Sequence, residues 1–360
     1  GHGQGPHHAG KLYGWAVLIG GTGFDVALTD NTIGFDINDE PVLGSVYGID
    51  IGNSVACTAQ SIMIGGTYSG AGNAIAGHLF NGVTVGRDMK GVLVSGNAIH
   101  DNGSLGIDLI PTGYGYGVMP NDALDRDTGG NGLQNFPELH AALREGSAIR
   151  VIGTLHSSPL DNFTVEFFAS PECHASGFGE GRMFLGHEDV ITDGSGNVDF
   201  DVLFLKTVPE GWFITATATG EPQGSTSEFS ACIGTPWRDE GSALAGTHGA
   251  PSLYGTGSLA ANEAVTLNLE NALEDTAAFL VVGTTTVNLP FYGGTLVPAF
   301  LPPSGFYMPK TTNNNGSVLI EGSWPVGMPA GTTTYFQYWI VDPAGPYGFS
   351  SSNALSGTTP

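Results

Sequence analysis

The chain has 360 residues, enough for two or three domains at about 100–200 residues each. It carries 10 Lys and Arg against 34 Asp and Glu, a formal charge of −24, although charged residues make up only 12% of the chain. Glycine supplies 57 residues, roughly twice the usual share, which argues against a mainly helical protein. The shortage of Lys and Arg argues against nucleic acid and anionic membranes as partners, and no apolar run is long enough for a spanning helix.

The first third of the chain is repetitive. Residues 72–85 (GNAIAGHLFNGVTV) and 96–109 (GNAIHDNGSLGIDL) align without gaps at an offset of 24. Two earlier segments, beginning at Gly14 and Gly48, echo the element at Gly82 at successive offsets of 34. Short apolar strands that repeat every few dozen residues, with Gly and Asn at the corners, are typical of a stacked β solenoid.

This wording resembles the right-handed parallel β-helix repeats of large secreted and surface proteins of bacteria. The resemblance covers about residues 10–137 and ends in MPNDALDRDTGGNGLQNFPEL, which is similar to the Asp- and Asn-rich segment that closes such helices. It implies a short β-helix over residues 1–140. It implies no particular activity, because one fold hosts many functions.

The rest of the chain predicts longer strands separated by turns. Six of them between about 148 and 233 indicate an antiparallel β-sandwich over 147–234, similar to the immunoglobulin-like modules that follow such helices. Residues 235–252, rich in Pro and Gly, are expected to be a linker. A second β-sandwich is expected over 253–360, and its closing pattern resembles the C-terminal module of secreted planctomycete and myxobacterial proteins. The whole chain is therefore expected to be all-β.

Two of the three cysteines, Cys173 and Cys232, lie inside the immunoglobulin-like segment. We expect them to form a disulfide, as suits an extracellular module, with two buried free thiols as the alternative. Cys57 is expected to be a small buried apolar residue of a coil.

The closing segment of the predicted helix is rich in side-chain oxygens. Carboxylates and amides spaced two to four residues apart in a Gly-rich loop suit a hard cation with 6–8 oxygen ligands, which predicts a structural calcium site. The expected ligands are Asn121, Asp122, Asp125, Asp127, Asn131 and Asn135. The alternative is a set of Asx turns that cap their own backbone. A second acidic stretch, Asp193 to Asp199, is expected to be a hairpin turn because it lacks the Glu of a calcium loop.

Asp50 and Asp108 each stand between two apolar residues of a short predicted strand. Alternation turns both outward, at equivalent positions two coils apart if the strand at 82–85 lies between them. Two strand spacings are about 9–10 Å, near the upper limit of roughly 6.5–9.5 Å for the carboxylates of an inverting glycosidase. A polysaccharide lyase or hydrolase should also supply several basic residues, and this region has only Lys11, Arg87, Lys90 and Arg126. Catalysis by Asp50 and Asp108 is therefore the minor alternative.

The histidines do not predict a transition-metal enzyme. His78 and His100 fall in equivalent corners, but their offset is 22 where the repeat is 24, so they need not stack. No His-x-x-x-His or Cys-x-x-Cys spacing appears.

An aromatic run near the C-terminus offers a contact surface. On a strand, Tyr335, Gln337 and Trp339 share one face, and Tyr347 follows closely. If that face is exposed, its rings could stack on sugars or dock another subunit.

Together these features favour a secreted or cell-surface bacterial protein with a structural or adhesive role and no catalytic set. An uncovered first coil would allow head-to-tail self-association into fibres. The other expected partner is extracellular matrix or polysaccharide. The alternatives are a carbohydrate-binding protein and a polysaccharide lyase or hydrolase.

Overall fold

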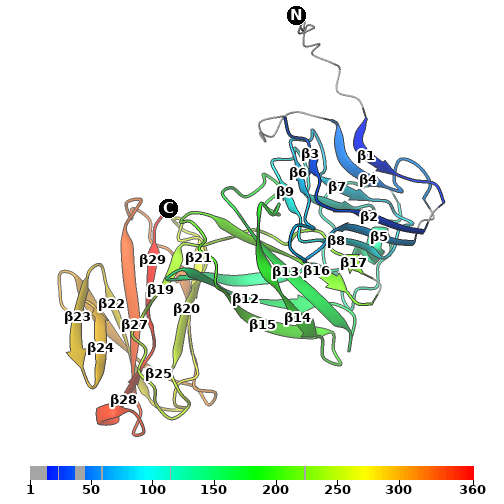
Figure 1. Ribbon diagram of the computed structural model, residues 1–360. Helices are drawn as coiled ribbons and strands as arrows, with labels where there is room; N and C mark the ends of the chain where they lie inside the picture. The colour runs from blue at the N-terminus through cyan, green and yellow to red at the C-terminus, as the bar shows by residue number, and fades with distance from the viewer. Residues whose placement is uncertain (1–13, 23, 37–44, 58–59, 114, 223) are drawn as a thin grey trace, which may run out of the picture. The chain divides into compact units, whose positions relative to one another are not determined.

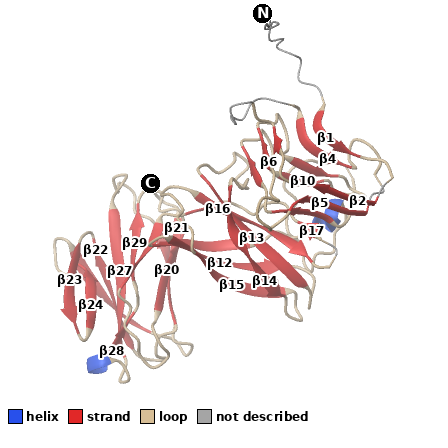
Figure 2. Ribbon diagram, viewed as in Figure 1, coloured by secondary structure: helices blue, strands red, loops and turns tan. Residues whose placement is uncertain are grey.

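The computed structural model describes residues 14–22, 24–36, 45–57, 60–113, 115–222 and 224–360. Strands dominate this part of the chain, whose helical elements are two short 3-10 turns, η1 (Gly130–Leu133) and η2 (Pro346–Gly348) (Figure 2). The predicted all-β class is confirmed. Within the described residues no helix is long and apolar enough to cross a bilayer.

The chain divides into two compact units. The first holds residues 1–138, 155–198 and 215–231, and the second holds 139–154, 199–214 and 232–360. The strands predicted between 148 and 233 are present, but they are divided between the two units. Each unit is described separately below.

Three parallel sheets form the start of the first unit, coloured blue to cyan in Figure 1, and each successive turn of chain adds one strand to each sheet. The first sheet contains β1 (Trp15–Ile19), β4 (Tyr47–Ile51), β7 (Val83–Val85) and β10 (Ile107–Leu109). The second contains β2 (Phe24–Leu28), β5 (Gln60–Gly65) and β8 (Val92–Ser95). The third contains β3 (Thr32–Ile33), β6 (Ala74–Ala76) and β9 (Ala98–His100).

The strand register follows the sequence repeat with one exception. Val83 pairs with Ile107, which confirms the offset of 24, and Ile49 pairs with Val83, which confirms one offset of 34. Val17, however, pairs with Ile49, so the first offset is 32 and the expected 34 was wrong by two residues. A shift of two leaves every side chain on the same face of the strand, so alternation of apolar residues cannot detect it.

The parallel strands enclose a core of branched aliphatic side chains. Ile49, Ile51, Val83 and Val85 of the first sheet are fully buried and belong to one cluster with buried residues of the other two sheets. Ile, Val and Leu suit such strands because their branched side chains pack well on a pleated surface.

A ladder of asparagines runs through one corner of these turns. Asn31 Nδ2 donates to Asn73 Oδ1 at 3.0 Å, and Asn73 Nδ2 donates to Asn97 Oδ1 at 2.8 Å. The same two carbonyl oxygens also accept the backbone N–H of Asn31 and Asn73. The ladder therefore satisfies polar groups that the corner would otherwise leave without partners.

Five further strands of the sheet that follows are antiparallel where their pairing is described. They are β13 (Asn162–Ser170), β14 (Met183–Ile191), β16 (Phe213–Gly220), β17 (Ser225–Thr226) and β18 (Ile233–Gly234). Phe168 and Phe229, whose rings lie 5.3 Å apart, join the aliphatic core of the parallel strands. The core of the turns is thus closed by aromatic side chains.

Three buried glutamates accept hydrogen bonds from the last turn of parallel chain. Glu166 accepts the Gly96 N–H, Glu180 accepts the Asn102 N–H, and Glu228 accepts the Leu109 N–H. Ile99 also exchanges both backbone hydrogen bonds with Gly181. These bonds satisfy the donors that the last turn would otherwise present on an open edge.

The second unit contains one large sheet, a smaller sheet and a hairpin. The large sheet runs in the order β15 (Asn197–Phe204), β12 (Ala148–His156), β11 (Glu138–Glu145), β19 (Trp237–Gly241), β29 (Ala354–Thr358), β27 (Thr333–Val341), β22 (Ala277–Gly283) and β25 (Gly305–Thr311), with β28 (Phe349–Ser351) beside β27. The smaller sheet contains β20 (Ser252–Thr256), β21 (Ala264–Glu270) and β26 (Val318–Ser323). The hairpin is formed by β23 (Thr286–Phe291) and β24 (Gly294–Pro298).

The segment expected to be a linker contributes to this sheet. β19 pairs in parallel with β11 and antiparallel with β29, and its Trp237 is buried in the main core of the second unit. Pro and Gly at its ends hid a five-residue strand from composition alone.

Candidate metal centre

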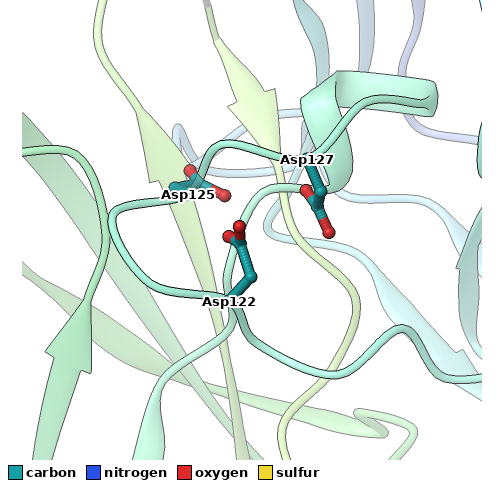
Figure 3. A group of neighbouring side chains, drawn as sticks. All are labelled: Asp122, Asp125 and Asp127. Carbon is teal, nitrogen blue, oxygen red and sulfur yellow. The ribbon is translucent and has the colours of Figure 1, made fainter.

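Three aspartates converge in the loop that follows β10. Asp122, Asp125 and Asp127 each offer a carboxylate oxygen within 4.8 Å of the others. Figure 3 shows the three side chains pointing into one space from a single turn of the loop. Leu124 and Asp125 both have left-handed backbones, with φ of 66° and 53°, and this tight turn brings positions 122, 125 and 127 together.

The three carboxylates differ in their hydrogen bonds. Asp122 accepts the backbone N–H of Arg126 at 3.0 Å, and Asp125 accepts the hydroxyl of Ser157 at 2.9 Å. Burial raises the pKa of the Asp125 carboxyl to about 6, and the neighbouring aspartates add to the rise. Asp127 is partly buried, and its Oδ1 is a buried oxygen with no hydrogen-bond partner. Its pKa is also raised, first by burial and then by Asp122.

The predicted asparagine ligands lie in the same region but already serve the backbone. The Asn121 amide exchanges hydrogen bonds with Phe136, and Asn135 Oδ1 accepts the Asp122 N–H at 3.0 Å. Asn131 is buried, accepts the Val92 N–H and donates to the Val92 carbonyl. The amides bond to backbone groups 13 to 39 residues away, so they do not form the Asx turns of the alternative, and the three carboxylates are the groups left facing one another.

This donor set fits a hard divalent cation. All three groups are carboxylates, one oxygen lacks a hydrogen-bond donor, and their mutual repulsion would be relieved by a positive ion. Ca²⁺ prefers such oxygens and takes 6–8 of them, so backbone carbonyls or water would complete its shell. No histidine or cysteine joins the three aspartates among the described residues.

The second acidic stretch is a turn. Asp193 Oδ1 accepts the N–H groups of Ser195 and Asn197 at 2.8 and 2.9 Å, as in an Asx turn. The expected hairpin is wrong, because the strands on either side, β14 and β15, belong to different sheets.

Asp50 and Asp108 are not the exposed residues that catalysis on a polysaccharide would need. They do occupy equivalent positions with Thr84 between them, but both side chains are fully buried. Asp50 accepts the N–H and hydroxyl of Ser54, and Asp108 accepts Asn81 Nδ2 at 2.6 Å and the Gly117 N–H at 3.3 Å. The outer side of this sheet is therefore covered, which strand alternation alone could not reveal.

The aromatic surface expected on β27 is buried as well. Gln337 and Trp339 are 0% and 2% exposed, Tyr335 is half-buried, and Tyr347 alone of the four is prominently exposed, at 81%. Gln337 accepts the Val297 N–H at 3.0 Å and donates to the Thr295 carbonyl, so it ties the hairpin strand β24 to β27. Both faces of β27 lie within the core because the hairpin covers the face expected to be free.

An aromatic hollow nevertheless opens beside Trp339, whose ring meets Phe291 edge-on at 4.8 Å. The hollow has about 270 Å³ of space and includes residues that sequence patterning did not single out. Its aromatic members are Phe279, Phe291, Tyr292, Phe300, Tyr307, Trp339 and Phe349.

The predicted disulfide is present, whereas Cys57 is only partly buried. Cys173 and Cys232 are disulfide-bonded, and Cys57 is free and packs partly against the core of the parallel strands.

Comparison with known proteins gives little guidance. No family model matches the sequence, and no curated protein matches it. Among solved structures, a tetra-tandem repeat from the extending region of a large adhesion protein matches with 12% identity and a TM-score of 0.19, covering 62% of this chain and 48% of that one. A red sea bream transglutaminase matches with 11% identity and a TM-score of 0.19, covering 61% of this chain and 31% of that one. The chain thus spans about half of the first structure's length and about a third of the second's. We draw no conclusion about this chain from TM-scores this low.

Proposed function

We propose that this chain is a secreted or cell-surface bacterial structural and adhesive protein stabilised by calcium. In this proposal the three parallel sheets are a short right-handed β-helix, and the chain beyond it consists of sandwich-like β modules. The disulfide between Cys173 and Cys232 suits an oxidising compartment.

The observation that carries the calcium proposal is the group of three aspartates. Asp122, Asp125 and Asp127 are held by a turn whose other polar groups are hydrogen-bonded, whereas Asp127 Oδ1 is buried without a partner. The turn η1, which follows the three aspartates, already bonds to β8 through Asn131. Bound Ca²⁺ would therefore hold a loop that is attached to the parallel strands.

Calorimetric titration of the chelated protein with Ca²⁺ tests the proposal. We expect one site in the unmodified chain, a loss of at least tenfold in affinity in Asp127→Asn, and unchanged binding in the exposed control Asp88→Asn. Absence of Ca²⁺ binding, or binding that both variants leave unchanged, would remove the metal from the account.

The enzyme alternative loses its two candidate residues. Asp50 and Asp108 are buried and hydrogen-bonded within the chain, so neither can reach a polysaccharide without rearrangement. The structural role is therefore the better-supported function.

Head-to-tail fibres built by stacking coil on coil also lose support. Such a contact needs an open edge at both ends, and the last turn already donates to Glu166, Glu180 and Glu228. Electron microscopy over a concentration series tests this: single particles or small oligomers agree with it, and fibres contradict it.

A further inference from the structure

A hollow in the described part of the first unit lies away from the three aspartates. It has about 800 Å³ of space, within the range of roughly 300–1,000 Å³ typical of small-molecule sites. Two stacked corners of the parallel strands and the loop between β13 and β14 line it. His78 and His100 both belong to its lining, although their spacing in the sequence did not predict a shared site.

Three charged or titratable side chains of the lining contact one another. Asp101 Oδ2 lies 2.7 Å from His100 Nδ1 and 3.4 Å from an Arg182 guanidinium nitrogen. Burial lowers the pKa of the His100 imidazole, and the hydrogen bond to Asp101 opposes that effect. With Nδ1–H donating to Asp101, the Nε2 atom of His100 is an acceptor.

A second part of the lining adds further carboxylates. Glu180 is buried and accepts the side-chain amide of Asn102 at 2.8 Å, while Glu172 is exposed and His174 is half-buried on the same lining. The hollow thus offers several hydrogen-bond acceptors and the guanidinium of Arg182 as a donor, and Leu79 and Pro171 add apolar surface.

The chemistry of this lining selects among ligand classes. A metal ion does not fit, because the only described His, Cys, Asp and Glu side chains that converge on one point are those of the aspartate loop. An anion does not fit, because Asp101, Glu172 and Glu180 face it against the single guanidinium of Arg182. A hydroxyl group fits, because it donates one hydrogen bond and accepts two, and so matches both kinds of group in the lining.

We propose that the hollow between the His78 and His100 corners and the loop at 171–182 binds a neutral sugar unit of an extracellular polysaccharide. The inference rests on the proposed adhesive function and gives it a ligand class and a location. Arg182 and Asp101 are the residues that read the sugar hydroxyls, and His100 is oriented by Asp101.

A glycan array carrying neutral and acidic oligosaccharides, probed with the labelled full-length chain, tests the proposal. We expect binding to neutral glycans, reduced at least tenfold in Arg182→Ala and in Asp101→Asn. Asp101 has a left-handed backbone, which Asn tolerates, so this variant should keep its fold. The control Arg238→Ala removes another half-exposed arginine that also pairs with a carboxylate, and it should bind as the parent does.

The proposal is overturned if no neutral glycan binds, if only acidic glycans bind, or if Arg182→Ala and Asp101→Asn leave binding unchanged. The same variants should retain Ca²⁺ binding in calorimetry. Loss of sugar binding in the variants, with calcium binding intact, therefore supports the hollow as the sugar site. Absence of calcium binding in the parent chain would instead contradict the proposed calcium-stabilised function.

Discussion

Buried glutamates are the residues on which the end of the parallel strands depends. Burial raises the pKa of Glu180 to about 7 and that of Glu228 to about 8, and it also raises the pKa of Glu166. Hydrogen bonds from Asn102 and Leu109 lower the first two values only in part. Each of these groups binds its proton more tightly in the folded chain than in the unfolded chain.

The stability of the protein should therefore fall between pH 6.5 and 8.5. A raised pKa contributes stability below the unfolded value and loses it as the pH rises through the folded value. Glu228 alone accounts for a loss on the order of 2 kcal/mol across this interval, since one pKa unit corresponds to about 1.4 kcal/mol. His78 and His100 have lowered pKa values, so their contribution is lost only as the pH falls below about 6.5.

Urea unfolding at the two pH values, in the presence of a chelator, measures this effect. The Glu228→Gln variant should be less stable than the parent chain at pH 6.5. Its free energy of unfolding should, however, differ less between pH 6.5 and pH 8.5. A parent chain whose free energy of unfolding stays level or rises with pH would contradict the role given to Glu228 and Glu180.

The disulfide stabilises the chain by restricting its unfolded state. Cys173 and Cys232 close a loop of about 60 residues, for which the expected contribution is about 3–4 kcal/mol. Replacement of both by Ser should lower the free energy of unfolding measured in urea by that amount. Reductant should lower the midpoint of the parent chain and leave the double variant unaffected; an equal response of the two would show that the bond adds no stability.

At the scale of elements, the asparagine ladder ties successive corners together. Asn97→Ala removes acceptors from the backbone N–H and side chain of Asn73, both of which are buried. Leaving a buried donor without a partner costs about 1–3 kcal/mol, and this loss should appear in urea unfolding. Asn315→Ala, at an exposed turn position, is the control and should change stability by no more than about 0.5 kcal/mol. Equal effects of the two substitutions would mean that the ladder is not a stabilising element.

The periodic elements were the most predictable part of the fold. The repeat predicted the pairing of β7 with β10, and the sequence pattern predicted strands between about 148 and 233, where they are found. The register of β1 was missed by two residues because a shift of two preserves alternation. Alternation indicates which residues share a face of a strand, and it carries no information on what covers that face.

Because alternation does not show what covers a face of a strand, it led to the errors at the candidate sites. Asp50 and Asp108 were expected on a free face, but the loops that follow their strands bond to them, and the face of Gln337 that could have been free is covered by the hairpin strand β24. The three aspartates of the closing loop were predictable because their convergence depends on a local turn. The His100 hollow was not, since Arg182 and Glu180 come from a loop about 80 residues away in sequence.

At the scale of the whole molecule, the proposed calcium loop follows the three parallel sheets of the first unit. The last turn is satisfied by glutamates, its core is closed by Phe168 and Phe229, and η1 bonds to β8 through Asn131. Calcium at Asp122, Asp125 and Asp127 would fix the remaining part of this closing loop. In this proposal, three of the 34 acidic residues have a specific use as calcium ligands.

Hydrogen exchange with mass spectrometry, with and without Ca²⁺, tests this central claim most directly. In Ca²⁺, amides of residues 119–137 should exchange more slowly in the parent chain, while those of residues 264–323 should not change. The protection should be absent in Asp127→Asn and retained in Asp88→Asn. Equal exchange of residues 119–137 with and without Ca²⁺ would contradict the account.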